Sequence, residues 1–366
     1  MFLRHKFLGL LFNFFCLFPL KRDRVVFVVD GGNSFGMPCE RIMGEFRRHG
    51  SNFSFCFFLK DRFDLVGLFR LACSGFVFLD DNFFPLAFMN FREGVSVVQL
   101  WHAPGVFKRF GYSVLDDVER RSLLERMGDR ISLLSVTSEN LKGFYSEAFQ
   151  VDEDRVEAFG FPRLDYYGDK DVDSLKESFL LDFPQARGKK IVLYAPTFRE
   201  NKVMNNVFDF LDVDLFNRVL GKEYVLCVRL HPKISSFIDD DTVLRSVLDS
   251  DKVIDLSAYP VEQDLVLLSD VLVTDYSSIM LEGVFIGKPV VFFAYDLEDY
   301  LEVERGFYFD YGDCVPGPIV RDTEGLIDNI KVLSEDRFRL DRCLSFEFDY
   351  RDSGASKRIV DFLLNE

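Results

Sequence analysis

Residues 269–300 read SDVLVTDYSSIMLEGVFIGKPVVFFAYDLEDY, and the pattern of this stretch is repeated along the chain. Its two apolar runs, 271–274 and 289–295, are nearly continuous, which is typical of strands buried on both faces of a parallel sheet. The segment between them, SSIMLEGVFIG, has apolar residues at helical spacing. A strand, a helix and a second strand in succession indicate an α/β fold.

The same alternation extends from this stretch through the rest of the chain. Eleven candidate strands are better divided between two sheets than placed in one. We therefore expect two Rossmann-like, doubly wound domains that face a central cleft, with the break in the polar, proline-containing stretch 176–190. The nine further apolar runs with strand character are residues 25–29, 53–59, 75–79, 95–101, 133–137, 156–161, 191–195, 224–230 and 252–256.

The composition excludes several classes of protein. The 366 residues are 48% hydrophobic and 28% charged, which are the values of a globular chain. Sixty acidic and 44 basic residues give a net charge of −16, which argues against general binding of nucleic acid. The seven cysteines are scattered without a C-x-x-C pair, so they favour a reduced cytosolic chain over a disulfide framework or a zinc site.

The first 24 residues differ from the rest in charge. They carry five basic residues against Asp23, a local charge of +4, around an apolar run at 7–20. That run is too short to span a bilayer, which needs about 20 apolar residues, and no cleavage site of a signal peptide follows it. We expect an interfacial anchor that binds anionic headgroups with its basic residues. A first helix buried in the protein is the alternative.

Two of the four histidines directly follow predicted strands. His102 follows the strand ending in VVQLW, and His231 follows the strand ending in VLCVRL, so each domain has one. Ligands of open α/β sheets bind beyond the carboxyl ends of the strands. His102 and His231 are therefore candidates for catalysis or phosphate contact. His5 and His49 lie in basic stretches where a surface position is expected.

A third strand end leads into a helix that begins with two serines. Ser277 and Ser278 stand at its N-terminus, where unpaired backbone N–H groups form an anion site and serine hydroxyls add donors. The alternative is that these serines only cap the helix. Glu282 lies one helical turn after Ser278 and would accept hydrogen bonds from ribose hydroxyls.

The remaining motifs are shorter. The strand at 191–195 is followed by Pro196 and Thr197, with Arg199 just behind them. The glycine-rich GGNSFG at 31–36 lacks both a P-loop and a dinucleotide fingerprint, so we interpret it as a turn at a strand end. We expect no obligatory metal, because the paired aspartates stand in charged, loop-like stretches; examples are Asp171 with Asp173 and Asp212 with Asp214.

Seven segments together show a resemblance to a known family. The sequence resembles the CDP-glycerol glycerophosphotransferases, which include teichoic acid primases and polymerases and related capsule enzymes. The resemblance covers roughly residues 25–360 and implies a GT-B-type fold with the donor nucleotide held mainly by the second domain. The segments are VVQLWHAPGVFKRFGY, GFPRLDYY, YAPTFRE, RLHP, RGFYFDY and PGPIV, together with the stretch 269–300.

The resemblance implies a role for individual residues. It makes His102 the base for the acceptor hydroxyl and places His231 at the pyrophosphate of the donor. Polymerases commonly have W-H-G-T-P where this chain has W-H-A-P-G at 101–105, and the altered loop bears on the identity of donor or acceptor. The other positions that match the substrate site are Trp101, Ala103, Arg163, Pro196, Thr197, Arg229, Ser277, Ser278 and Glu282.

The implied reaction transfers glycerol phosphate, or a related polyol phosphate, from CDP-glycerol to a hydroxyl of a lipid-linked acceptor, with release of CMP and no obligatory cofactor. The alternatives are a GT-B glycosyltransferase that uses a nucleotide-sugar, and a membrane-bound scaffold with a decayed site. We expect a peripheral protein on the cytoplasmic face of the membrane. Its expected parts are a membrane-association segment at 1–24, an acceptor domain at 25–183 and a nucleotide-donor domain at 184–366 whose last helix crosses back.

Overall fold

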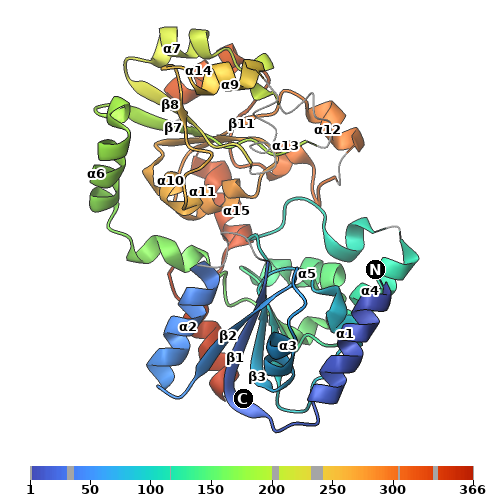
Figure 1. Ribbon diagram of the computed structural model, residues 1–366. Helices are drawn as coiled ribbons and strands as arrows, with labels where there is room; N and C mark the ends of the chain where they lie inside the picture. The colour runs from blue at the N-terminus through green and yellow to red at the C-terminus, as the bar shows by residue number, and fades with distance from the viewer. Residues whose placement is uncertain are drawn as a thin grey trace. The chain divides into compact units, whose positions relative to one another are not determined.

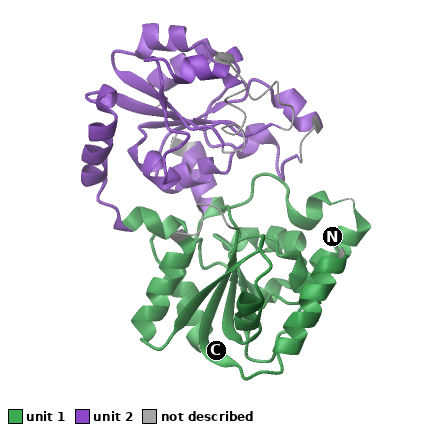
Figure 2. Cartoon of the chain, viewed as in Figure 1, with its two compact units in different colours: residues 1–168, 346–366 green, residues 169–345 purple. Residues whose placement is uncertain are grey.

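The computed structural model describes residues 2–30, 37–115, 117–199, 206–231, 242–303, 306–332 and 337–365. The glycine-rich turn expected at 31–36 lies outside these residues. Figure 2 shows the two compact units of the chain, unit 1 with residues 1–168 and 346–366 and unit 2 with residues 169–345.

The sheet of unit 1 is parallel, with six strands among the described residues in the order β2-β1-β3-β4-β5-β6. The apolar run VVFVV supplies the buried part of β1, which pairs with β2 on one side and β3 on the other. The direction in which successive strands are added to the sheet changes between β1 and β3, and sheets of this kind bind ligands at the carboxyl ends of the strands at such a point. The strands are β1 (Lys21–Val29), β2 (Ser54–Leu59), β3 (Ser74–Leu79), β4 (Ser96–Gln99), β5 (Leu133–Ser135) and β6 (Val156–Glu157).

Helices cover both faces of this sheet (Figure 1). On one face, α2 (Met37–His49) and α16 (Ala355–Asn365) pack together, and their apolar side chains share a core with β1. On the other face, α3 (Leu65–Ala72) packs against β2 and β3, and α1 (Phe2–Phe15) packs against α3. The other helices of this unit are α4 (Val118–Gly128) and α5 (Lys142–Phe149).

The last residues of the chain are joined to the rest of unit 1 by two carboxylates, the buried Asp165 and the exposed Asp349. Asp165 accepts the backbone N–H groups of Ala355 and Ser356 at 2.9 and 2.8 Å, so it caps the start of α16. Asp349 accepts the hydroxyl of Ser138 and the N–H of Glu139 beyond the end of β5. These hydrogen bonds fix the return of the chain, one set to Asp165 and the other to the segment that follows β5.

The sheet of unit 2 is also parallel, and its six described strands have the order β12-β11-β10-β7-β8-β9. This is the doubly wound order of a dinucleotide-binding sheet, with its switch point between β7 and β10. β12 was not expected from the sequence, because two residues are too few to give a pattern. The strands are β7 (Lys190–Tyr194), β8 (Tyr224–Val228), β9 (Ile254–Asp255), β10 (Val271–Thr274), β11 (Val290–Phe293) and β12 (Ile319–Val320).

Helices also cover both faces of the second sheet, which confirms the expected pair of doubly wound α/β domains (Figure 1). α7 (Val213–Leu220), α9 (Thr242–Leu248) and α14 (Thr323–Val332) share a core with one face. α10 (Glu262–Leu268) packs on β7, and α11 (Ile279–Phe285) packs on β10 and β11. The other helices are α6 (Val172–Asp182), α12 (Leu297–Val303), α13 (Tyr311–Cys314) and α15 (Arg337–Glu347).

The structure divides the chain earlier than the break expected at 183/184. The boundary lies at 168/169, because α6 packs against α10 and therefore belongs to unit 2. The side chain of Phe179 on α6 is fully buried and its ring lies 6.3 Å from that of Tyr259. Residues 1–24 are likewise not a separate part, since α1 and the first residues of β1 lie within unit 1.

Helix α1 is packed on one face and exposed on the other. Leu8 and Phe12 are buried, and a Cβ added to Gly9 would lie 2.4 Å from that of Phe88. The amide of Asn13 donates to the carbonyl of Phe88 and accepts the N–H of Asn90. The alternative of a helix packed on the protein therefore describes one face of α1, and the other face is exposed. The described part of the chain contains no helix long and apolar enough to cross a bilayer.

Candidate functional site

At the carboxyl edge of the sheet of unit 1, two carboxylates lie next to each other, and each faces a nitrogen of another side chain. Asp80 and Asp81 follow β3 at the switch point. Lys60 Nζ lies 2.7 Å from a carboxylate oxygen of Asp80 and 3.6 Å from one of Asp30. His102 follows β4, and its Nδ1 lies 3.6 Å from Oδ1 of Asp81. The histidine singled out from the sequence is thus paired with a carboxylate from the neighbouring strand end.

The two aspartates differ in electrostatics. Burial raises the pKa of Asp80, and the charge and hydrogen bond of Lys60 offset this rise only in part. Burial also acts to raise the pKa of Asp81, but the nearby His102, the backbone N–H of Asn82 and the charge of Lys60 together outweigh it and lower the pKa below its usual value. Asp81 is therefore the carboxylate that is favoured in its ionised form.

The backbone at Trp101 is strained. Its φ of +63° lies in the left-handed region that costs free energy for any residue except glycine. Burial of the indole offsets this cost, because its ring stacks on Phe110 at 5.3 Å and meets the ring of Phe149 edge-on at 5.0 Å. The Trp101 ring also lies 3.9 Å from the ring of His102. The strained turn therefore positions His102.

The loop that follows His102 is held at several points by buried side chains. The hydroxyl of Tyr145 lies 2.8 Å from the carbonyl of Gly105 and 3.3 Å from that of Ala103. A carboxylate oxygen of Glu347 accepts the N–H of Val106 at 3.0 Å. The W-H-A-P-G segment, which contains Ala103, is thus a fixed loop.

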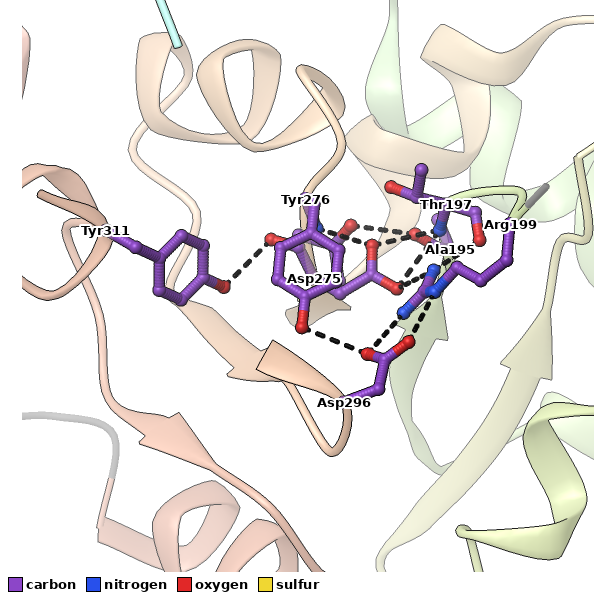
Figure 3. A network of polar contacts seen from close by, with 8 residues as sticks. Ala195, Thr197, Arg199, Asp275, Tyr276, Asp296 and Tyr311 are labelled. Carbon is purple, nitrogen blue, oxygen red and sulfur yellow. Dashed lines mark hydrogen bonds and ion pairs between the residues drawn. The ribbon is translucent and has the colours of Figure 1, made fainter. Parts of the chain in front are cut away.

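At the carboxyl edge of the sheet of unit 2, three motif segments meet in one buried ionic network (Figure 3). Arg199, from the segment after β7, forms two hydrogen bonds to Asp296, at 2.8 and 2.9 Å. Its remaining terminal nitrogen lies 2.7 Å from Asp275, which follows β10. Asp296 follows β11, so one guanidinium joins the ends of three adjacent strands.

Aromatic side chains surround this network. Tyr276 donates its hydroxyl to Asp296 at 3.0 Å, and its ring lies 5.0 Å from the guanidinium carbon of Arg199. Burial by itself lowers the pKa of Arg199, but the charges of Asp275 and Asp296 outweigh it and raise the pKa above its usual value. Burial raises the pKa of Tyr276, so its hydroxyl stays protonated as a donor. Sequence reasoning noted Arg199 but missed both aspartate partners.

The network orders the residues predicted to contact phosphate. Asp275 accepts the N–H of Thr197 at 2.9 Å, which fixes the turn that contains Pro196. Oγ1 of Thr197 is buried and has no hydrogen-bond partner among the described residues. Ser277 Oγ accepts the N–H of Ile279 at 3.3 Å, as the capping alternative expected. Ser278 occupies the N-cap position of α11, a helix of only seven residues.

Other predicted residues are already engaged within the protein. Glu282 is 3% exposed, and the amide of Gln263 donates to its carboxylate at 3.0 Å. Arg229 donates to the carbonyls of Leu256 and Tyr259 at 3.0 and 2.8 Å, so it holds the loop after β9.

The remaining predicted residues lie in both units. His231 follows β8, is exposed, and its ring lies 6.0 Å from that of Phe198. Arg163 belongs to unit 1, with its guanidinium carbon 6.0 Å from the centre of the Phe161 ring.

The aspartate pairs have a structural role. Asp171 accepts the N–H groups of Asp173 and Ser174 as the N-cap of α6, and Asp212 accepts that of Leu215 as the N-cap of α7. In the described ranges, three or more His, Cys, Asp or Glu side chains do not gather into a group that could hold a metal ion.

Comparison with known proteins identifies relatives along the whole chain. The sequence profile of the family described as CDP-Glycerol:Poly(glycerophosphate) glycerophosphotransferase matches residues 10–365. The teichoic acid poly(ribitol-phosphate) polymerase of Bacillus spizizenii is 35% identical over 362 residues, which make up 96% of this chain and 57% of the polymerase. The teichoic acid glycerol-phosphate primase of Bacillus subtilis is 29% identical over 84% of this chain and 78% of the primase.

A solved structure has the same fold as this chain. The wall teichoic acid polymerase TagF superposes with a TM-score of 0.78 at 25% identity, over 99% of this chain and 94% of the TagF chain. The expected GT-B-type fold is thereby confirmed. The chain spans little more than half the length of the ribitol-phosphate polymerase and about three quarters of the primase.

Proposed function

Because the chain belongs to the CDP-glycerol glycerophosphotransferase family, we propose that it transfers a polyol phosphate from a CDP-linked donor to a hydroxyl of a lipid-linked acceptor in teichoic acid or similar polymer synthesis. Glycerol phosphate is the first expectation and ribitol phosphate the second. The observation that carries the proposal is that the motif segments converge on the carboxyl edges of both sheets, with His102 at one and Thr197 and Ser277 at the other. Sheets of this kind bind their ligands there.

The proposed step exchanges one phosphorus–oxygen bond for another. The acceptor oxygen attacks the β-phosphorus, which bears the polyol, and its proton passes to His102. CMP leaves with the electron pair of the broken bond. The side chain of His102 is 50% exposed, so a substrate can reach it. Help from a positioned base contributes about 10²–10⁴-fold to such a step.

We propose that unit 2 holds the donor nucleotide. Thr197 is suited to donate to a phosphate oxygen, because its buried hydroxyl has no partner within the described segments. Ser277, Ser278 and His231 would add donors, and Glu282 would accept ribose hydroxyls next to Gln263. All of these groups belong to the protein, so we expect transfer to proceed in the presence of EDTA.

Two arginines and the loop of unit 1 are also proposed to serve substrate binding. Arg229 would act by fixing the loop after β9, whose carbonyls it binds. Arg163, Trp101 and Ala103 are proposed to contact substrate from unit 1.

The test measures nucleotide release with a lipid-linked acceptor and CDP-glycerol, CDP-ribitol or a UDP-sugar as donor. We expect CMP from one or both CDP-polyols, and the ratio of their kcat/KM values identifies the polyol. His102→Ala should lower turnover by at least about 10²-fold. His49→Ala, which removes an exposed histidine paired with Asp361, is the matched control and should keep activity. Release of UDP without CMP would instead support a glycosyltransferase, and no release from any donor would support a scaffold.

We also propose that the protein binds the cytoplasmic face of the membrane through α1. Because both faces of this helix are apolar, packing Leu8 and Phe12 inward leaves a second apolar stripe exposed. The exposed residues of this stripe are Leu3, Phe7, Leu10, Phe14 and Leu17, continued by Phe63, Leu65 and Val66 at the start of α3. An exposed row of eight apolar side chains is typical of a contact site.

The charges at the edge of the stripe favour a lipid surface as its partner. Arg4, Lys6, Lys21 and Arg22 are exposed near its two ends, on a protein whose net charge is −16. Each basic residue near an anionic membrane contributes about 1 kcal/mol, whereas apolar side chains enter the lipid boundary. The stripe therefore fits an anionic bilayer.

Flotation with phosphatidylglycerol-containing vesicles tests this part of the proposal. A variant with Leu10, Phe14 and Leu17 changed to serine should float less than the wild type, while its activity on a short soluble acceptor is kept. Leu181→Ser, at an equally exposed leucine on α6, is the control and should float like the wild type. Equal flotation of the triple variant and the wild type would contradict binding through α1.

A further inference from the structure

The pairing of His102 with Asp81 constrains where the imidazole carries its proton. Nδ1 is the ring nitrogen that lies 3.6 Å from Oδ1 of Asp81. An ionised carboxylate only accepts hydrogen bonds, so the favourable neutral ring is the one with hydrogen on Nδ1. In that tautomer the lone pair is on Nε2, which is the form that a base requires.

Asp81 is oriented for this contact by its surroundings. The N–H of Asn82 donates to the same oxygen, Oδ1, at 2.6 Å, which limits rotation of the carboxylate. The neighbouring Asp80 is paired with Lys60 at 2.7 Å, so the two adjacent carboxylates have different partners. The lowered pKa of Asp81 agrees with a carboxylate that stays ionised.

One buried side chain links the backbone of Asp81 to that of Trp101, the residue before His102. Gln99, the last residue of β4, is fully buried. Its Oε1 accepts the N–H of Trp101 at 2.9 Å, and its Nε2 donates to the carbonyl of Asp81 at 3.4 Å. Because Trp101 precedes His102 directly, this amide sets the spacing between the strand end that carries Asp81 and the turn that carries His102.

We propose that Asp81 is a positioning residue that holds His102 in the Nδ1–H tautomer and stabilises the imidazolium formed when Nε2 takes the proton of the acceptor. This inference rests on the proposed function of His102. The acceptor O–H bond breaks as the new O–P bond forms, and the proton moves to Nε2. Asp81 gains no proton; its carboxylate faces the Nδ1–H of a ring that now carries a positive charge.

Nitrogen-15 NMR of histidine-labelled protein tests the inference without relying on activity. The sequence has only four histidines, so the ring signals can be assigned with single substitutions. We expect the His102 signals of the wild type at neutral pH to show hydrogen on Nδ1, and Asp81→Asn to shift the ring toward hydrogen on Nε2. Asp361→Asn, which removes the partner of His49, should change the His49 signals and leave those of His102 unchanged.

Kinetics provide the second readout. Asp81→Asn should lower kcat by at least about tenfold with little change in KM for the donor, because a tautomer effect acts on the chemical step. Asp81→Glu retains the carboxylate and should restore part of both the tautomer and kcat. An unchanged His102 tautomer in folded Asp81→Asn would overturn the inference. A changed tautomer with wild-type kcat in both Asp81→Asn and His102→Ala would leave the pairing standing and overturn the proposed role of His102.

Discussion

Glu347 provides a test of burial that does not depend on the reaction. Its side chain is 5% exposed and accepts one hydrogen bond, from the N–H of Val106. Burial raises the pKa of this carboxyl from an ordinary 4.5 to about 8, and the hydrogen bond from Val106 opposes the rise only in part. The perturbation is Glu347→Gln, which keeps an acceptor for Val106 and removes the titrating proton.

The direction in which stability changes with pH follows from which state of the protein binds the proton. Between pH 4.5 and about 8 the folded protein keeps the proton on Glu347 and the unfolded chain has lost it, so the free energy of unfolding falls as pH rises. Each pH unit in this window costs up to about 1.4 kcal/mol. From about pH 5.5 to about pH 7.5, the wild type should therefore lose about 2–3 kcal/mol relative to Glu347→Gln.

The assay is urea unfolding followed by tryptophan fluorescence at several pH values. Trp101 is the only tryptophan in the sequence and is buried in unit 1, so its emission reports the unit that contains Glu347. The stability difference between variant and wild type should grow with pH and level off above about pH 8. Parallel pH profiles for the two proteins would refute the reasoning, because they would mean that Glu347 is ionised in the folded state.

Three further predictions concern other parts of the molecule. Arg199→Met should destabilise unit 2 by about 3–5 kcal/mol, measured by circular dichroism, because it leaves two buried carboxylates without their cation; a loss below about 1 kcal/mol would contradict this. Thr197→Val should leave the melting temperature of the free protein nearly unchanged and reduce the stabilisation by CDP-glycerol, and an undiminished ligand shift would count against the proposed phosphate contact. Deletion of residues 2–15 should expose the core around Phe12 and cause aggregation at any salt concentration, so a monomeric, folded product would show that α1 is dispensable.

Much of the fold could be predicted because the strands are buried on both faces. Runs such as VVFVV in β1 and VVFF in β11 are apolar without a break, and this pattern depends only on local sequence. The order of the strands could not be predicted, because it depends on which strands pair although they lie far apart in the sequence. The sequence therefore placed Arg199, Asp275 and Asp296 at three strand ends without indicating that β7, β10 and β11 are neighbours.

In the candidate site, too, single residues could be predicted from the sequence, but their partners could not. His102 stood out because it is rare and directly follows a strand, whereas Asp81 is one of many acidic residues and follows a different strand. The two faces of α1 could not be assigned either, because its apolar residues are spread around the helix and give no signal for which side packs on the protein. Contacts between segments distant in sequence account for what the sequence did not reveal.

The return of the chain into unit 1 has a consequence for synthesis on the ribosome. Unit 2 is one continuous segment, so all of its strands have been made before α16 is translated. The sheet of unit 1 is translated first, yet the core between β1 and α2 lacks Ile359, Val360 and Leu363 until α16 arrives. During this interval an apolar face of the nascent first unit stays open to chaperones or to wrong partners. The unit that is translated first is therefore the one that finishes folding last.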